Sequence, residues 1–213
     1  MNRSRQVKQV ISAHLSDHLS IYTFIAVLFL MGIVFGAVIV NSLSLTQKEE
    51  LTVYLSRFFG QVSDGQFATS SEMFHQSLTH YVKYISLMWL LGLTIIGLPI
   101  VLIMLFLKGI VVGFTVGFLV NQMSWKGFLL AFVSVFPQNI LAVPAMIVVG
   151  TASLTFSLRL MRQLVMKRRT ELILTPFIRF SVLVICTLGV LCMAAWFEAY
   201  LSPGLLKAVV DMK

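Results

Sequence analysis

Residues 21–40 read IYTFIAVLFLMGIVFGAVIV, an uninterrupted run without a single charged side chain. A helix needs about 20 such residues to cross the hydrocarbon core of a bilayer, which is about 30 Å thick. The apolar residues of this run do not alternate with polar ones, as they would in the strands of a membrane barrel. The run therefore predicts a transmembrane α-helix.

The composition of the whole chain agrees with that prediction. Of the 213 residues, 58% are hydrophobic and 11% are charged, and the mean hydropathy is +0.93. A soluble domain could not hide so much apolar surface, so the lipid bilayer is the expected partner. The net charge is +8, but the basic residues lie between apolar runs and form no patch for nucleic acid. The predicted fold class is all-α, a polytopic helical membrane protein.

Further apolar runs follow the first and predict about five transmembrane helices in a single membrane domain over residues 1–213. Lys108 is expected to separate two of these spans, and Pro99 to kink the earlier one. The predicted spans are 21–40, 84–107, 109–123, 128–158 with a break at 137–139, and 175–197. An outer loop is expected at 41–83 and a cytoplasmic basic loop at 159–174.

The distribution of Lys and Arg predicts the orientation of the chain. The basic residues Arg159, Arg162, Lys167, Arg168, Arg169 and Arg179 stand against the single acid Glu171. The positive-inside rule places this segment and the N-terminus in the cytoplasm, and an odd number of spans places the C-terminus outside. The span at 109–123 is short, however. A re-entrant loop over 109–136 followed by one crossing is the alternative, and it would put the basic loop outside.

Two predicted spans carry glycines at intervals of four residues. Gly32 and Gly36 share one helix face, and Gly109, Gly113 and Gly117 share another. Small residues in this register let two helix backbones approach closely, which is a main source of attraction between helices in lipid. The pattern predicts helix packing, either within the chain or between copies in a possible homo-oligomer.

The sequence contains no recognisable catalytic, metal or cofactor site. No Asp or Glu falls in the middle of a predicted span, and Glu198 lies at the outer edge of the last one. His75 and His80 have no acidic partner at ligand spacing. Intramembrane proteases and ion-coupled transporters need titratable groups within the membrane. We therefore expect no enzyme activity, no metal and no cofactor.

A polar helix break interrupts the fourth span. Pro137 removes a backbone donor, and Gln138 and Asn139 follow it directly. Their amides can satisfy the backbone groups that the proline leaves open. Alternatively they line a polar path together with Asn121 and Gln122, as unwound helices do in transporters.

The outer loop contains an amphipathic pattern with helical spacing. Its apolar face consists of Leu51, Tyr54, Leu55, Phe58, Phe59 and Val62. Thr46 to Glu49 has the form of a capping box, and Gly60 or Gly65 could end the helix. The helix could rest on the outer leaflet, or its apolar face could dock a protein outside the membrane.

Several stretches resemble the stage II sporulation protein M family of endospore-forming bacteria. They are FLMGIVFGA at 29–37, LKGIVVGFTVGF at 107–118 and FPQNIL at 136–141. The resemblance implies a non-enzymatic component of the engulfment machinery, located in the sporulation septum and the engulfing membrane. It also implies stage II sporulation proteins D and P, which degrade septal peptidoglycan, as partners. The wider superfamily carries Pro-His-Gly-x-x-Glu where this chain has Pro137-Gln138-Asn139 and Ala142, so no proton- or metal-linked role is carried over.

Two functions follow as hypotheses. The first is a membrane scaffold that anchors or recruits peptidoglycan-degrading proteins on the outer face of the cell membrane. The alternative is a small transporter or channel subunit with a broken-helix pathway around 121–144.

Overall fold

The protein is described by a computed structural model of the whole chain, and the structure describes residues 19–63, 70–166 and 174–210. Side chains are described except at 58–59, 61–63, 165–166 and 201–210. The helices are α2 (Leu19–Ser42), α3 (Leu45–Ser63), α4 (Ser70–Gly92), α5 (Gly97–Ser134), α6 (Phe136–Met166) and α7 (Leu174–Val210). All regular structure within these ranges is helical, which confirms the predicted all-α class.

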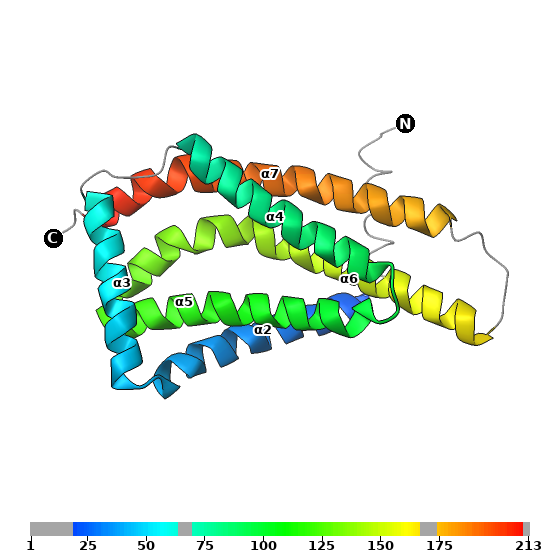
Figure 1. Cartoon of the computed structure of the whole chain (residues 1–213), viewed down its shortest axis with the longest axis horizontal. Helices are drawn as coiled ribbons and strands as arrows, with labels where there is room; N and C mark the ends of the chain where they lie inside the picture. The colour runs from blue at the N-terminus through cyan, green and yellow to red at the C-terminus, as the bar shows by residue number, and fades with distance from the viewer. Residues whose placement is uncertain (1–18, 64–69, 167–173, 211–213) are drawn as a thin grey trace.

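Five of these helices run lengthwise, and α3 lies across one end of them (Figure 1). We call this end the α3 end. The opposite end, where α6 finishes and α7 begins, carries Arg159 and Arg162 of α6 and Arg179 of α7. We call it the arginine end. The predicted cytoplasmic side corresponds to the arginine end, and the orientation of the chain in the membrane stays a prediction.

Helix α5 consists of two parts that reverse direction at Ser124. This residue has φ 48° and ψ −121°, a conformation in the left-handed half of the map that residues with a side chain rarely adopt. A Cβ placed on Gly127 would meet the carbonyl of Leu119, so only glycine lets the chain fold back this tightly. Residues 97–123 therefore lead to the α3 end, and residues 125–134 lead back from it (Figure 1).

Four of the described helices are long and apolar enough to cross a membrane. They cover Leu19–Ser42, Gly97–Ser134, Phe136–Leu164 and Leu174–Tyr200. This confirms a polytopic membrane protein. Helix α4 also runs lengthwise (Figure 1), but its first half is polar, and it does not belong to this group.

The boundary predicted at Lys108 is wrong. The chain reverses at residues 93–96, and residues 97–123 form one continuous helical segment with Lys108 in its interior. Lys108 lies about 16 Å along the helix from Gly97. Pro99 is the third residue of α5. A proline fits there without a kink, because the backbone N–H groups of the first helical turn have no acceptor within the helix and the missing N–H breaks no hydrogen bond. The predicted span at 109–123 was short because it is the second half of a longer helix. Residues 109–123 continue to the α3 end as part of α5 (Figure 1).

The turn at 93–96 is closed by hydrogen bonds within the protein. The Thr94 hydroxyl donates to the Leu91 carbonyl at 2.9 Å and accepts from the Gly97 N–H at 3.0 Å. Ser157 of α6 donates to the Thr94 carbonyl at 2.8 Å. The turn exposes Thr94, Ile95 and Ile96, and Ile96 is 77% exposed. A turn with satisfied polar groups and an exposed isoleucine suits an apolar environment.

Two predicted loops are shorter than expected. Residues 70–83, expected in the outer loop, belong to α4, which packs against α5, α6 and α7. Helix α6 continues through Arg159 and Arg162 to Met166, so half of the basic loop predicted at 159–174 is helical. Residues 167–173 lie outside the described part of the chain. The outermost spans, predicted at 21–40 and 175–197, match the apolar parts of α2 and α7.

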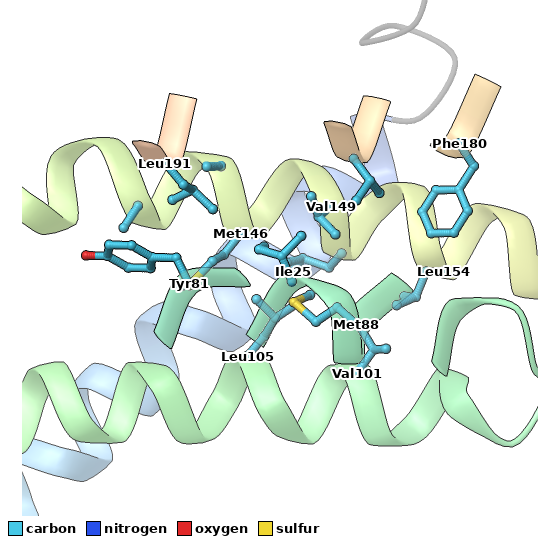
Figure 2. Packing of buried hydrophobic residues seen from close by; sticks show 14 of the residues in the cluster. Ile25, Tyr81, Met88, Val101, Leu105, Met146, Val149, Leu154, Phe180 and Leu191 are labelled. Atoms are coloured by element: carbon cyan, nitrogen blue, oxygen red, sulfur yellow. The ribbon is translucent and has the colours of Figure 1, made fainter. Parts of the chain in front are cut away.

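The apolar core lies where α2, α4, α5, α6 and α7 meet. Its fully buried side chains include Ile25, Met88, Leu105, Met146 and Leu191, one from each of these helices (Figure 2). Tyr81 of α4 lies at the edge of this cluster with its hydroxyl turned away from it (Figure 2).

Candidate functional site

Helix α3 begins with a reciprocal cap. The Ser44 N–H donates to Oε1 of Gln47 at 3.0 Å, and the Gln47 N–H donates to Oγ of Ser44 at 3.3 Å. This is a capping box, in which two side chains accept hydrogen bonds from backbone N–H groups that have no acceptor within the helix. It stands two residues before the Thr46 to Glu49 box predicted from the sequence. The helix is thus defined by its own sequence as well as by its contact with α7.

The predicted docking face of α3 is only partly free. Leu51 and Leu55 are half-buried, whereas Tyr54 is 70% exposed. The side chains of Phe58, Phe59 and Val62 lie outside the described residues. The face therefore turns one edge toward the rest of the protein and leaves Tyr54 available to another molecule.

Helices α2 and α5 meet along a seam of glycines. A Cβ on Gly32 would lie 2.5 Å from the Phe106 carbonyl oxygen, and one on Gly109 would lie 2.5 Å from the Phe29 carbonyl oxygen. A Cβ on Gly36 would meet the Ile110 carbonyl in the same way. These atoms belong to the backbone of the facing helix, so they cannot move aside as the end of a flexible side chain can.

The seam continues beyond these three glycines. A Cβ on Gly113 would meet the Ile33 carbonyl, and one on Gly117 would lie 3.0 Å from Cα of Ala37. Contacts advance together along both helices, so α2 and the first part of α5 run parallel. The structure thus places all five predicted glycines at a contact within one chain.

The amides of the polar break between α5 and α6 donate to backbone carbonyls one turn earlier in the chain. Nδ2 of Asn139 donates to the Val135 carbonyl at 2.7 Å, and Nε2 of Gln138 donates to the Ser134 carbonyl at 3.2 Å. Asn121 is exposed and Gln122 half-buried near the reversal at the α3 end. No hydrogen bond among the described residues joins the two groups. Both amides thus bond to backbone carbonyls beside the proline, as the structural interpretation of the break predicts.

This geometry predicts a limited effect of Asn139→Leu. The change removes one side-chain hydrogen bond to a helix carbonyl, which is worth about 1 kcal/mol. We expect a correspondingly small loss of stability in detergent denaturation and normal function in the cell. Asn121→Leu, which breaks no hydrogen bond among the described residues, is the matched control. A complete loss of function at normal protein level for either change would instead support the polar path.

A polar cluster that the sequence analysis missed lies inside the helix bundle. The Tyr81 hydroxyl of α4 donates to Oε2 of Glu198 of α7 at 3.2 Å. Lys108 of α5 is half-buried and lies within electrostatic range of the Glu198 carboxylate. A lysine within an apolar span is expensive and usually faces an opposite charge inside the protein. Tyr81, Lys108 and Glu198 join three helices and form a candidate functional site.

A signal for this cluster exists in the sequence. Thr94, Gly97 and Pro99 are typical of a turn followed by a helix start. Beginning the helix there places Lys108 in its interior, where a lysine needs a carboxylate partner. Glu198 is the acid that the apolar part of the last span offers.

Further hydrogen bonds hold α4 in the bundle. The Tyr84 hydroxyl donates to the Met104 carbonyl of α5 at 2.7 Å, and Nε1 of Trp89 donates to Oγ of Ser181 of α7 at 3.3 Å. Ser153 of α6 donates to the Met88 carbonyl at 3.2 Å. Helix α4 is therefore bonded to all three of its neighbours by side chains.

Over residues 19–63, 70–166 and 174–210, no group of three His, Cys, Asp or Glu side chains could hold a metal ion.

The fold and the site define an all-α, multi-pass membrane protein with a glycine seam and an intramembrane polar cluster. Residues 25–203 match the family model of Stage II sporulation protein M. The chain belongs to the stage II sporulation protein M family and is a sporulation membrane protein. Comparison with curated proteins and with solved structures found no match.

Proposed function

We propose that this protein is a non-enzymatic scaffold of the engulfment machinery. It sits in the sporulation septum and later in the engulfing membrane. There it anchors or recruits septal peptidoglycan-degrading proteins on the outer face, with stage II sporulation proteins D and P as its partners. Membership of the stage II sporulation protein M family supports a role in sporulation.

The position of α3 is the observation that carries this proposal. The helix lies across the end of the bundle (Figure 1) and contacts α7, yet Leu45 is 80% and Tyr54 70% exposed. An aromatic side chain at the edge of a fixed surface is the kind of residue that dominates small interfaces. A helix held across the end of a membrane bundle presents such a residue at a constant height above the lipid.

The experiment replaces Tyr54 together with Phe58 and Phe59, the aromatic residues of the docking face predicted from the sequence. Tyr54→Ala with Phe58→Ala and Phe59→Ala should leave the protein inserted at normal level, because α3 remains capped and tethered. Loss of one aromatic anchor can cost about 2 kcal/mol, or about 30-fold in affinity. We expect proteins D and P to be lost from affinity-purified, crosslinked membranes of sporulating cells, and septal wall removal to stall.

Ser56→Ala is the matched control, since Ser56 lies on the opposite face of α3 and donates only to its own helix at Thr52. Normal co-purification of both partners with the triple variant would contradict the proposal and leave α3 as a helix resting on lipid.

The alternative, a small transporter or channel subunit, is favoured by Lys108 within α5 and Glu198 within α7, because ionisable residues at membrane depth often mark pathways. A path through this cluster predicts that Lys108→Cys reacts with small charged thiol reagents from the aqueous phase. A closed scaffold predicts no reaction there.

A further inference from the structure

Helix α4 carries an exposed polar face. Gln76, Thr79, His80 and Lys83 are exposed and recur at helical spacing on one side of α4. The opposite side, which includes Tyr81, is buried in the core. The same exposed side continues toward the arginine end with apolar residues, Leu87 at 47% and Leu90 at 54% exposure. The face therefore changes from apolar to polar partway along the helix.

The polar part of this face lies at the depth of the apolar spans. The Tyr84 hydroxyl bonds the Met104 carbonyl, and Gly32 of α2 contacts Phe106 two residues further along α5. From that level α2 continues over 33–40 for about 12 Å toward the α3 end. This stretch exposes apolar side chains, among them Val34, Phe35 and Val38.

Lys83 is also far from the other end of α4. It lies about 14 Å along α4 from Gly92, where the turn to α5 begins. Either distance exceeds the length of a lysine side chain, so snorkelling does not bring its ammonium group to water. No carboxylate pairs with Lys83 among the residues that the structure describes. A lysine at this depth costs about 3 kcal/mol on insertion scales unless another molecule solvates it.

We propose that this face of α4 binds a transmembrane helix of a partner protein, and that the partner helix carries a carboxylate facing Lys83 and His80. The charges support this occupant, because the exposed face offers an ammonium group and an imidazole, and the acid that α4 itself carries, Glu72, lies eight residues before His80 in the first turn of the helix. Polar side chains across two membrane helices bind each other where lipid offers no alternative. A second copy related by two-fold symmetry would bring two Lys83 ammonium groups to the same depth, which is unfavourable. The contact is separate from α3 and does not depend on it.

The test uses the full chain in lipid nanodiscs and a synthetic probe. The probe is a leucine–alanine transmembrane peptide with one central glutamate, and the matched probe has leucine at that position. Energy transfer from a donor on the protein to an acceptor on the peptide reports binding. We expect the glutamate probe to bind at least about tenfold more tightly than the leucine probe, a difference of about 1.4 kcal/mol.

Two protein variants locate the contact. Lys83→Met with His80→Leu should abolish the preference for glutamate, whereas Lys126→Met, which removes an exposed cation beyond the α5 reversal, should retain it. The triple alanine variant of α3 should also retain it, which separates this contact from the proposed function.

Three results would overturn the inference. The first is equal binding of both probes. The second is disulfide formation between two copies through Thr79→Cys, with Cys186 and Cys192 changed to serine, which would make a second copy the occupant. The third is rapid labelling of Thr79→Cys by a water-soluble maleimide in the absence of probe, which would make the face part of an aqueous groove.

Discussion

Replacing Gly113 with leucine is expected to remove most of the folded protein from the membrane. A Cβ at this position already overlaps the Ile33 carbonyl of α2, and a backbone atom cannot rotate away as a flexible side chain can. The two helices must separate, and the close contacts along the whole seam are lost with them. Overpacking of this kind costs about 3 kcal/mol or more, which changes the folded-to-unfolded ratio about 100-fold. Gly113→Ala should also destabilise, because the Cβ alone overlaps the carbonyl.

The control for this change lies in α7. A Cβ on Gly189 would have no atom within 4 Å, so Gly189→Leu should leave the amount of folded protein unchanged. Both variants are compared by the fraction that stays monodisperse after mild detergent extraction and by protease resistance of the membrane fraction. A normal level of protease-resistant Gly113→Leu would contradict the packing of α2 against α5.

The glycine seam shows what a local pattern in the sequence can predict. The spacing is four residues between Gly32 and Gly36 in α2, and again from Gly109 to Gly113 to Gly117 in α5. In each helix this spacing defines one face without reference to the rest of the fold. Which helix lies opposite depends on tertiary structure. The parallel pairing of α2 with α5 within one chain therefore became visible only in the structure.

The reversal between α4 and α5 does not lie at the charged residue. Lys108 looks like the end of a span, since a lysine is costly in lipid. The chain turns instead at Thr94, whose hydroxyl bonds both sides of the turn, and residues 84–107 around it in the sequence carry no charge. A partner distant in sequence, Glu198, lies within electrostatic range of Lys108 in the helix interior. Such long-range compensation cannot be predicted from hydropathy.

The start of α3 was displaced for a related reason. Both Ser44 to Gln47 and Thr46 to Glu49 fit the pattern of a capping box. The end of the preceding helix decides between them. Helix α2 ends at Ser42 and α3 begins at Leu45, so only a short link separates the two helices. The earlier cap is the one whose hydrogen bonds form.

Replacing Glu198 with leucine is expected to destabilise the protein strongly. Glu198 accepts the hydrogen bond of Tyr81 and lies within electrostatic range of Lys108, so its loss leaves a hydroxyl without its acceptor and a lysine without its counter-charge. Removing one partner of a fully buried pair costs about 3 kcal/mol, whereas replacing both by apolar residues is often nearly neutral. Lys108 and Glu198 are half-buried, so this cost is the upper bound for Glu198→Leu. Glu198→Leu with Lys108→Leu should therefore recover most of the stability that Glu198→Leu alone loses.

Met193→Leu, at a position of α7 that is 62% exposed, is the control for a change on this helix. The measurement is a double-mutant cycle of unfolding in mixed detergent micelles. If the double variant were as unstable as the sum of both single changes, Lys108 and Glu198 would not be coupled, and the cluster would reduce to the Tyr81–Glu198 hydrogen bond.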